Sequence, residues 1–275
     1  METFYFGDPD HALFGAFHDA GAARNVAVLL IPAHGHEYVR SHRAMHIIAQ
    51  RLASLGCDVL RVELTGQGDS AGEDTEGDVD RWRRDVKVAV GELRDRSMAR
   101  SVSAVGLRLG AALLAAAVAR DALDIDKLIL WDPVIRGSEY LNELDRLHIE
   151  MLADPHRFDP PRKGSSESNE QLGFAITPQQ RASIRSLDLT AQVEWPCRRV
   201  CLVAGPTVSN ADIDAVGERI RAAGTKLRIV RLAGSGGWTE LRKVEDTLQA
   251  PEAITTIADE LTAGATAAAG SVAGR

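Results

Sequence analysis

The pentapeptide from Gly106 to Gly110, with the sequence GLRLG, has the residue spacing in this chain that is most closely tied to chemistry. It follows a mostly apolar run and precedes an alanine-rich run typical of a helix, so it is expected at a strand-to-helix turn. A G-x-S-x-G sequence at such a turn exposes a catalytic serine, and its glycines let the helix pack close to the strand. Here the middle residue is Arg108. A guanidinium stays protonated and cannot attack a carbonyl, so the turn is expected without a nucleophile.

Arg108 has two interpretations at this turn. In the first, it binds an anion, because the adjoining helix N-terminus offers unpaired amides such as that of Leu109 and a guanidinium matches a carboxylate or phosphate. In the second, Arg108 forms an ion pair with Asp132 or Glu63 and closes the site, because a buried arginine without a partner is costly. The sequence leaves both interpretations open.

The histidines near Gly35 are the candidates for proton transfer. His34 and His36, together with His42 and His148, could supply a general base, because imidazole titrates near neutral pH. The alternative is that His34 and His36 hold their loop through hydrogen bonds to the backbone. Their spacing would suit a pair of metal ligands, but the sequence offers no evident third ligand. We therefore predict no metal site and no cofactor.

The elements that must position these residues alternate between strand and helix patterns. Parallel strands are expected at 26–32, 58–63, 101–106, 127–131, 199–204 and 226–232. Helices are expected at 43–55, 79–96, 109–119, 211–222 and 251–261, and residues 3–6 and 14–18 could add antiparallel strands at one edge. This alternation predicts an α/β fold with a mostly parallel sheet covered by helices on both faces.

The regular alternation stops between residues 133 and 196. An insertion of this length after one strand is expected to form a helical lid over the carboxyl ends of the strands, with the site beneath it. We expect a single domain over residues 1–262. The alanine- and glycine-rich residues 263–275 are expected to form a disordered tail.

Composition excludes several classes of partner and location. A formal charge of −7 with 26% charged residues gives no basic excess for nucleic acid. No apolar run approaches the ~20 residues that cross a bilayer. The first ten residues do not resemble a signal peptide, and the three cysteines make an odd count without metal-ligand spacing. A cytoplasmic protein with neither nucleic-acid binding nor a membrane span is expected.

The order of motifs resembles the α/β-hydrolase superfamily, specifically its serine-aminopeptidase-like branch. The sequence IPAHGH at 31–36 is similar to the family loop that supplies one amide of the oxyanion hole. The sequence ELTGQGDS at 63–70 is similar to the family segment D-x-R-G-x-G-x-S. The resemblance implies an oxyanion or ligand-binding site built from Gly35, His36 and Leu109.

A narrower resemblance rests on three segments. GLRLGA at the turn, LWDPV at 130–134, and Tyr140 followed by Leu141 are together similar to a bacterial subgroup described as hydrolases associated with exosortase systems. That subgroup is linked to cell-surface polysaccharide loci. The resemblance implies a role in such a biosynthetic pathway.

Two departures from the family pattern bear on activity. The family serine corresponds to Arg108, and the family histidine corresponds to the segment 234–238, after which no histidine occurs. The Ser-His-acid mechanism requires both a nucleophile and a base. An acid could remain as Asp132, or as Asp212 or Asp214, for which a role at a helix start is the alternative.

The residues favour a lidded protein of this fold that lacks the Ser-His pair and serves as an accessory or ligand-binding protein. Its expected partners are a small acyl or anionic ligand and either a second copy of the chain or a biosynthetic enzyme. The alternative is an atypical hydrolase or acyltransferase that acts on an ester or thioester through the oxyanion hole and Arg108. Its catalytic candidates are Arg108, Asp132 and His34.

Overall fold

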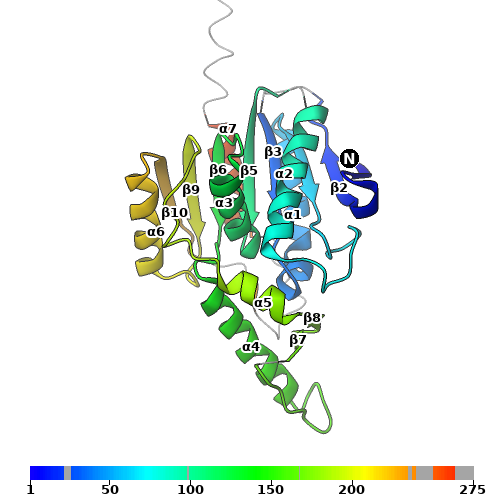
Figure 1. Ribbon diagram of the computed structural model, residues 1–275. Helices are drawn as coiled ribbons and strands as arrows, with labels where there is room; N and C mark the ends of the chain where they lie inside the picture. Colours follow the sequence, from blue (N-terminus) through cyan, green and yellow to red (C-terminus); the bar gives the residue numbers. More distant parts are fainter. Residues whose placement is uncertain (22–25, 98, 167, 235–236, 240–249, 264–275) are drawn as a thin grey trace, which may run out of the picture.

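The computed structural model describes the 275-residue chain except for residues 22–25, 98, 167, 235–236, 240–249 and 264–275. The main sheet contains β1 (Glu2–Phe6), β2 (Leu13–His18), β3 (Val26–Ile31), β4 (Asp58–Val62), β5 (Ser101–Leu107), β6 (Lys127–Trp131), β9 (Arg199–Ala204) and β10 (Lys226–Arg231). Figure 1 shows these eight strands, ordered β1-β2-β4-β3-β5-β6-β9-β10. β2 pairs antiparallel with both β1 and β4, and the other pairs are parallel. The α/β architecture predicted from the sequence is confirmed, including its antiparallel edge.

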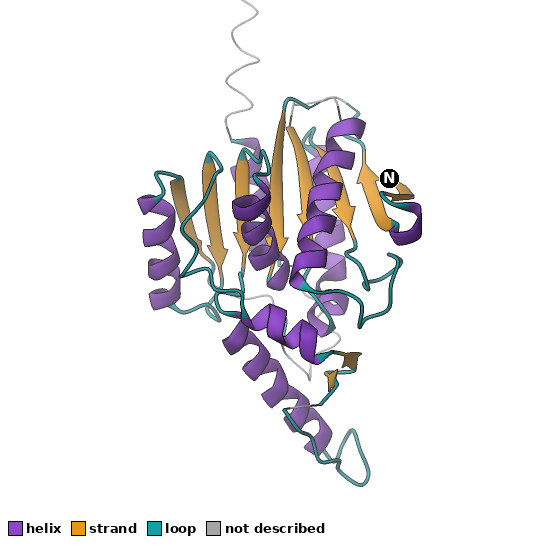
Figure 2. Ribbon diagram, viewed as in Figure 1, coloured by secondary structure: helices purple, strands orange, loops and turns teal. Residues whose placement is uncertain are grey.

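Helices cover both faces of the sheet (Figure 2). They are α1 (His36–Ser54), α2 (Val79–Arg96), α3 (Leu109–Asp121), α6 (Asn210–Ala222) and α7 (Pro251–Thr262). Two further helices, α4 (Gly137–Ala153) and α5 (Pro178–Arg185), belong to the insertion between β6 and β9. Alternate residues of β3 serve the two faces: Leu29 joins the core with α2, α3 and α6, and Leu30 joins the core with α1 and α7. Strands buried on both faces explain the nearly continuous apolar runs in the sequence.

One helix begins well before its predicted start. The apolar periodicity indicates a helix only from residue 43, whereas α1 begins at His36. Its first turn carries few apolar side chains, because Glu37 and Arg40 are buried there as polar groups. Periodicity therefore could not detect the first turn. His36 consequently lies in a helix and not in the preceding loop.

The residues between β6 and β9 lie at the carboxyl ends of the strands, where Figure 1 shows α4 and α5. This insertion also contains the short hairpin of β7 (Glu170–Gln171) and β8 (Phe174–Ala175). A buried network joins its parts: Arg181 on α5 donates to Asp145 on α4 at 2.8 Å, and Gln171 donates to the same carboxylate at 2.6 Å. The insertion is thereby tied together by polar contacts as well as by apolar ones.

Two sequence expectations concern the chain as a whole. In the described part of the chain, no helix is long and apolar enough to cross a membrane. Of the expected tail, residues 264–275 lie outside the described residues. The division into one domain over 1–262 and a tail stays a prediction.

Candidate functional site

The strand-to-helix turn at Arg108 has a strained backbone. Arg108 has φ 54° and ψ −120°, a conformation that is costly for a residue with a side chain. Its amide donates to the carbonyl of Trp131 at 3.0 Å, and its own carbonyl accepts from the amide of Val134 at 3.2 Å. Two hydrogen bonds with the end of β6 and the residues directly after it therefore hold the turn in place.

Two glycines let α3 approach the sheet at this turn. A Cβ on Gly110 would overlap the carbonyl oxygen of Pro32, and a Cβ on Gly106 would lie 2.5 Å from the Cα of Ala111. Neither position has room for a side chain. The sequence-based interpretation of these glycines as close-packing residues is therefore supported by the backbone geometry.

The Arg108 side chain is ion-paired with Glu37, the second residue of α1. Both Nε and Nη2 of Arg108 lie 2.9 Å from Oε1 of Glu37. The hydroxyl of Tyr140 donates to Oε2 of the same carboxylate at 3.1 Å. Glu37 is 0% exposed and Arg108 is 7% exposed. The side chain at the turn therefore forms a buried ion pair, and Tyr140 bonds the other carboxylate oxygen of Glu37.

This pairing corrects the partners expected from the sequence. Arg108 was expected to pair with Asp132 or Glu63, but Nη1 of Arg108 contacts only the backbone carbonyl of Asp132, at 3.4 Å. Glu63 instead bonds Tyr38 and the amide of Asp69. Glu37 was missed because the start of α1 was missed. Its adjacency to the His-Gly loop was the available clue.

Electrostatics favour a charged Arg108 beside a charged Glu37. Burial alone would lower the pKa of Arg108, but the Glu37 carboxylate beside it raises that pKa. Burial raises the pKa of Glu37, and the guanidinium and the Tyr140 hydroxyl act against that rise. A carboxylate that accepts three N–H or O–H donors is suited to its ionised form. The pair is consequently neutral overall.

Asp132 is fully buried at the end of β6, and both of its oxygens are occupied. Oδ1 accepts from the amide of Gly205 at 2.6 Å, and Oδ2 accepts from the indole Nε1 of Trp238 at 2.9 Å. Trp238 lies in the segment that the resemblance aligned with the family histidine. An indole N–H donates a hydrogen bond and cannot accept a proton. Asp132 therefore holds a group without base chemistry.

A small cavity of about 20 Å³, with room for about one water molecule as the side chains stand, adjoins the turn. Its lining combines His34, Gly35, His36 and Leu109 with apolar side chains of the insertion, among them Leu144. Leu109 is the first residue of α3, and no acceptor within the described part of the chain takes up its N–H. The cavity thus offers one amide donor at a helix N-terminus and mainly apolar walls.

The histidines of the cavity are neutral at neutral pH. Burial lowers the pKa of His34 to about 4, and the ring lies 4.5 Å from that of Trp82. Burial also lowers the pKa of His36, with Arg40 and Arg157 acting in the same direction. The Nε2 atom of His36 is buried, and no described residue forms a hydrogen bond with it. His34 and His36 are therefore placed at the site but are disfavoured as proton acceptors.

The other candidate residues lie elsewhere. His148 accepts a hydrogen bond from the amide of Leu172 at 3.1 Å, inside the insertion, and His42 lines a different cavity. Asp212 is in the first turn of α6, where it bonds the capping Ser209 and pairs with Arg136 at 2.5 Å. Its role at a helix start is confirmed. The structure therefore does not gather the four histidines into one site.

Metal binding finds no support in the geometry. Within the described ranges, no group of three or more histidine, cysteine, aspartate or glutamate side chains is placed to hold a metal ion. Cys57, Cys197 and Cys201 form no disulfide bond.

Solved structures place the fold among the α/β hydrolases. The esterase Est1E of Butyrivibrio proteoclasticus, solved with ferulic acid, has a TM-score of 0.66 and 16% identity, covering 94% of this chain and 99% of that one. The α/β hydrolase GrgF of Penicillium sp. sh18 has a TM-score of 0.66 and 16% identity, and the match covers 95% of this chain and 97% of that one. An esterase of Pyrococcus furiosus has a TM-score of 0.61 and 16% identity, and the match covers 95% of this chain and 89% of that one. These similarities define an α/β-hydrolase fold.

The family follows from a match to the sequence itself. Residues 24–168 match the family model described as serine aminopeptidase, S33, so the chain belongs to this family. No curated protein sequence matches the chain.

Proposed function

We propose that this chain is a non-hydrolytic member of its family that binds a small acyl ligand beneath the insertion. The observation that carries the proposal is the ion pair between Arg108 and Glu37 at the turn where the family places its nucleophile. Trp238 supports it, because its indole N–H occupies Asp132 where the family pattern expects a histidine. Neither a guanidinium nor an indole can serve as nucleophile or base.

The chemistry of the cavity favours an acyl ligand over a strong anion. The charge of Arg108 is already balanced by Glu37, and its N–H groups are directed at Glu37 and the carbonyl of Asp132. The free donor is the amide of Leu109, which suits a single carbonyl oxygen. The apolar side chains of the insertion, such as Leu144 and Ile184, suit a short hydrocarbon chain.

Binding of butyramide and butyrate to the full chain tests this ligand class, with thermal unfolding and saturation-transfer NMR as readouts. We expect Leu144→Trp to fill the cavity and abolish binding, whereas Ile149→Trp, on the exposed side of the same helix, keeps it. Equal binding by wild type and Leu144→Trp would refute the site. Butyrate binding much tighter than butyramide binding would show that an anion, not a neutral acyl group, is preferred.

One observation favours the second candidate, an atypical hydrolase or acyltransferase. The unpaired amide of Leu109 beside the cavity is the geometry of half an oxyanion hole. If Arg108 acts in that reaction, Arg108→Ala should lower ester or thioester turnover by about 10²–10³-fold. Turnover that Arg108→Ala leaves unchanged would remove Arg108 from this candidate's mechanism.

The cellular role follows from the narrower resemblance. We place the protein as an accessory component of a bacterial biosynthetic pathway for surface polysaccharide, acting with a second copy or with a biosynthetic enzyme. The GLRLGA and LWDPV segments support this assignment. Co-purification of the tagged chain with an enzyme of such a pathway would test it.

A further inference from the structure

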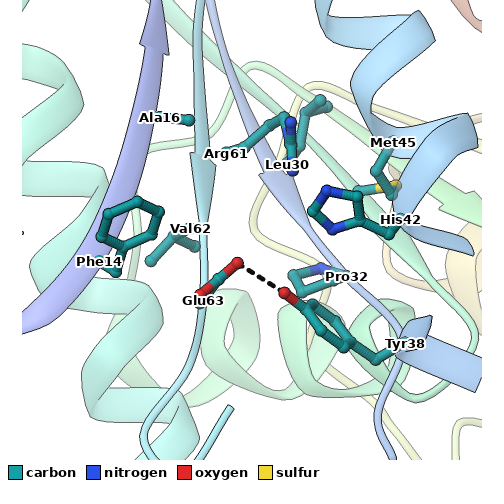
Figure 3. A pocket seen from close by; sticks show the side chains of 10 residues that line it. All are labelled: Phe14, Ala16, Leu30, Pro32, Tyr38, His42, Met45, Arg61, Val62 and Glu63. Atoms are coloured by element: carbon teal, nitrogen blue, oxygen red, sulfur yellow. Dashed lines mark hydrogen bonds between the residues drawn. The ribbon is translucent and has the colours of Figure 1, made fainter. Parts of the chain in front are cut away.

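A second cavity lies on the α1 face of the sheet, between α1 and the strands β2 and β4 (Figure 3). Its volume is about 20 Å³, and it shares no lining residue with the cavity beside Leu109. Its polar lining residues are Tyr38, His42, Arg61 and Glu63. Neither the proposed function nor the family pattern accounts for this group.

The sequence brings these side chains together through simple periodicities. Tyr38, His42 and His46 are four residues apart along α1, so they share one face of the helix. On the sheet, Arg61 is paired with Ala16, whose small side chain leaves space beside the guanidinium. Figure 3 shows Arg61 and His42 approaching the same space from the strand and the helix.

Histidines extend the cluster beyond the lining. The ring of His46 lies 5.8 Å from the ring of His18, the last residue of β2. His18 is 4% exposed, and its buried Nε2 atom has no hydrogen-bond partner among the residues that the structure describes. A buried polar atom without a partner carries a free-energy cost that a ligand or water could offset.

Arg61 carries a positive charge that the cluster does not balance by contact. In the part of the chain that the structure describes, no carboxylate lies within ion-pair distance of Arg61, and its Nη1 contacts Nδ1 of His46 at 3.1 Å. Glu63, which lines the same cavity, uses Oε1 to accept from the Tyr38 hydroxyl at 2.5 Å and Oε2 to accept from the amide of Asp69 at 2.6 Å. The guanidinium therefore keeps donors for a further acceptor.

We propose that this cluster is a binding site for a small oxyanion, in which Arg61 supplies the charge and His42 supplies a hydrogen bond. Nδ1 of His46 accepts from Arg61 and so helps to hold the guanidinium in place. A guanidinium beside an imidazole N–H group suits a sulfate-like or phosphate-like dianion and also a carboxylate. The proposal does not depend on the proposed function.

The affinity of this site for an anion should rise as pH falls. Burial lowers the pKa of His42 and of His46, and Arg61 acts in the same direction, whereas Glu63 opposes the shift at His42. Burial lowers the pKa of His18 to about 4, with Arg61, His46 and the chain's amino terminus adding to the effect. A bound anion opposes these effects and favours protonated imidazoles. Protons and anion therefore bind cooperatively.

Calorimetric titration of the full chain with sodium sulfate at low ionic strength tests the proposal, because sulfate keeps its charge over the relevant pH range. We expect saturable binding that weakens by about tenfold or more in Arg61→Gln, since hydrogen bonds to charged groups are among the stronger ones. The matched control is Arg51→Gln, an exposed arginine on α1, which should bind as wild type does. His42→Gln should weaken binding severalfold and guards against misfolding of the Arg61 variant.

Three results would overturn the proposal: no saturable binding by wild type, Arg61→Gln binding as wild type does, or equal weakening by Arg51→Gln. Wild-type affinity should also rise from about pH 8 to about pH 5.5, with a smaller rise in Arg61→Gln. An affinity independent of pH would contradict the role given to the imidazoles. A parallel titration with acetate distinguishes the sources: binding of both anions supports a carboxylate ligand, and binding of sulfate alone supports a phosphate-type ligand.

Discussion

At the scale of single residues, the candidate site depends most on the ion pair between Arg108 and Glu37. Both side chains are buried, and Glu37 also accepts from Tyr140. Breaking a buried pair from one side leaves an uncompensated charge, which costs far more than an exposed pair contributes. The pair is therefore a sensitive point for both stability and function.

Glu37→Gln should lower the free energy of unfolding by about 3–5 kcal/mol, because Arg108 then stays buried without its counter-charge. Urea denaturation measures the change. Glu143→Gln is the control, since Glu143 lies 4.0 Å from Arg108 and its side chain is 42% exposed, so its loss should cost less than about 1 kcal/mol. Replacing both members of the pair by methionine should recover much of the loss. Equal effects of Glu37→Gln and Glu143→Gln would contradict this account of the pair.

His34 makes stability depend on pH on the acid side. Its pKa is lowered to about 4 by burial, so between about pH 6.5 and 4 the unfolded chain takes up a proton that the folded chain excludes. Stability should therefore be lost as pH falls through this window, by on the order of 3 kcal/mol at its lower end. Urea denaturation of wild type and His34→Asn at several pH values checks this. A variant whose stability falls as steeply as that of wild type would argue against it. The pKa of His18 is lowered in the same way, so the stability of both proteins should still fall somewhat with pH because of His18.

The positions of several candidate residues could be predicted from the sequence, but their contacts could not, and their role in a site stays a prediction. Arg108, Leu109, His34 and Gly35 lie where the motif spacing indicates, because such turns are local in sequence. Glu37 approaches Arg108 from a different element, and no local pattern encodes that contact. The contact between Glu37 and Arg108 depends on how α1 packs on the sheet, which is a tertiary and not a local property.

At the scale of elements, the contact between α3 and the sheet depends on Gly110. A side chain there would overlap the carbonyl of Pro32. We expect Gly110→Ala to destabilise the protein by about 3 kcal/mol or more, because the backbone must shift to relieve the overlap. Thermal or urea unfolding would measure it.

Gly91 provides a matched control for the Gly110 variant. It lies exposed in α2, and a Cβ there would meet nothing within 4 Å. Gly91→Ala should stabilise the protein by about 0.5–1 kcal/mol, because alanine favours a helix more than glycine does. Loss of stability in both variants would contradict the distinction drawn between the two glycines.

The elements themselves were largely predictable. Each of the six parallel strands lies within one residue of its predicted bounds, because strands buried on both faces give continuous apolar runs. The start of α1 was not predictable, since its first turn faces the polar site. The insertion carries two helices and a small hairpin whose positions depend on contacts such as Asp145 with Arg181.

At the scale of the whole molecule, the chain has an α/β-hydrolase fold, and we propose that its site has a different chemistry. The sheet order, the turn between β5 and α3, and the acid at the end of β6 together form a complete scaffold. The groups set on that scaffold are an ion-paired arginine and an indole. The central claim is therefore that this fold persists here without ester hydrolysis.

Reaction of wild-type protein with a fluorophosphonate probe tests that claim most directly, with intact-protein mass spectrometry as the readout and an active serine esterase run alongside. Hydrolysis of p-nitrophenyl acetate and butyrate is followed in the same samples. We predict no covalent adduct and no turnover above background, because Arg108 is held by Glu37 and Trp238 donates to Asp132. A stoichiometric adduct on one serine, accompanied by ester turnover that the probe abolishes, would contradict the account.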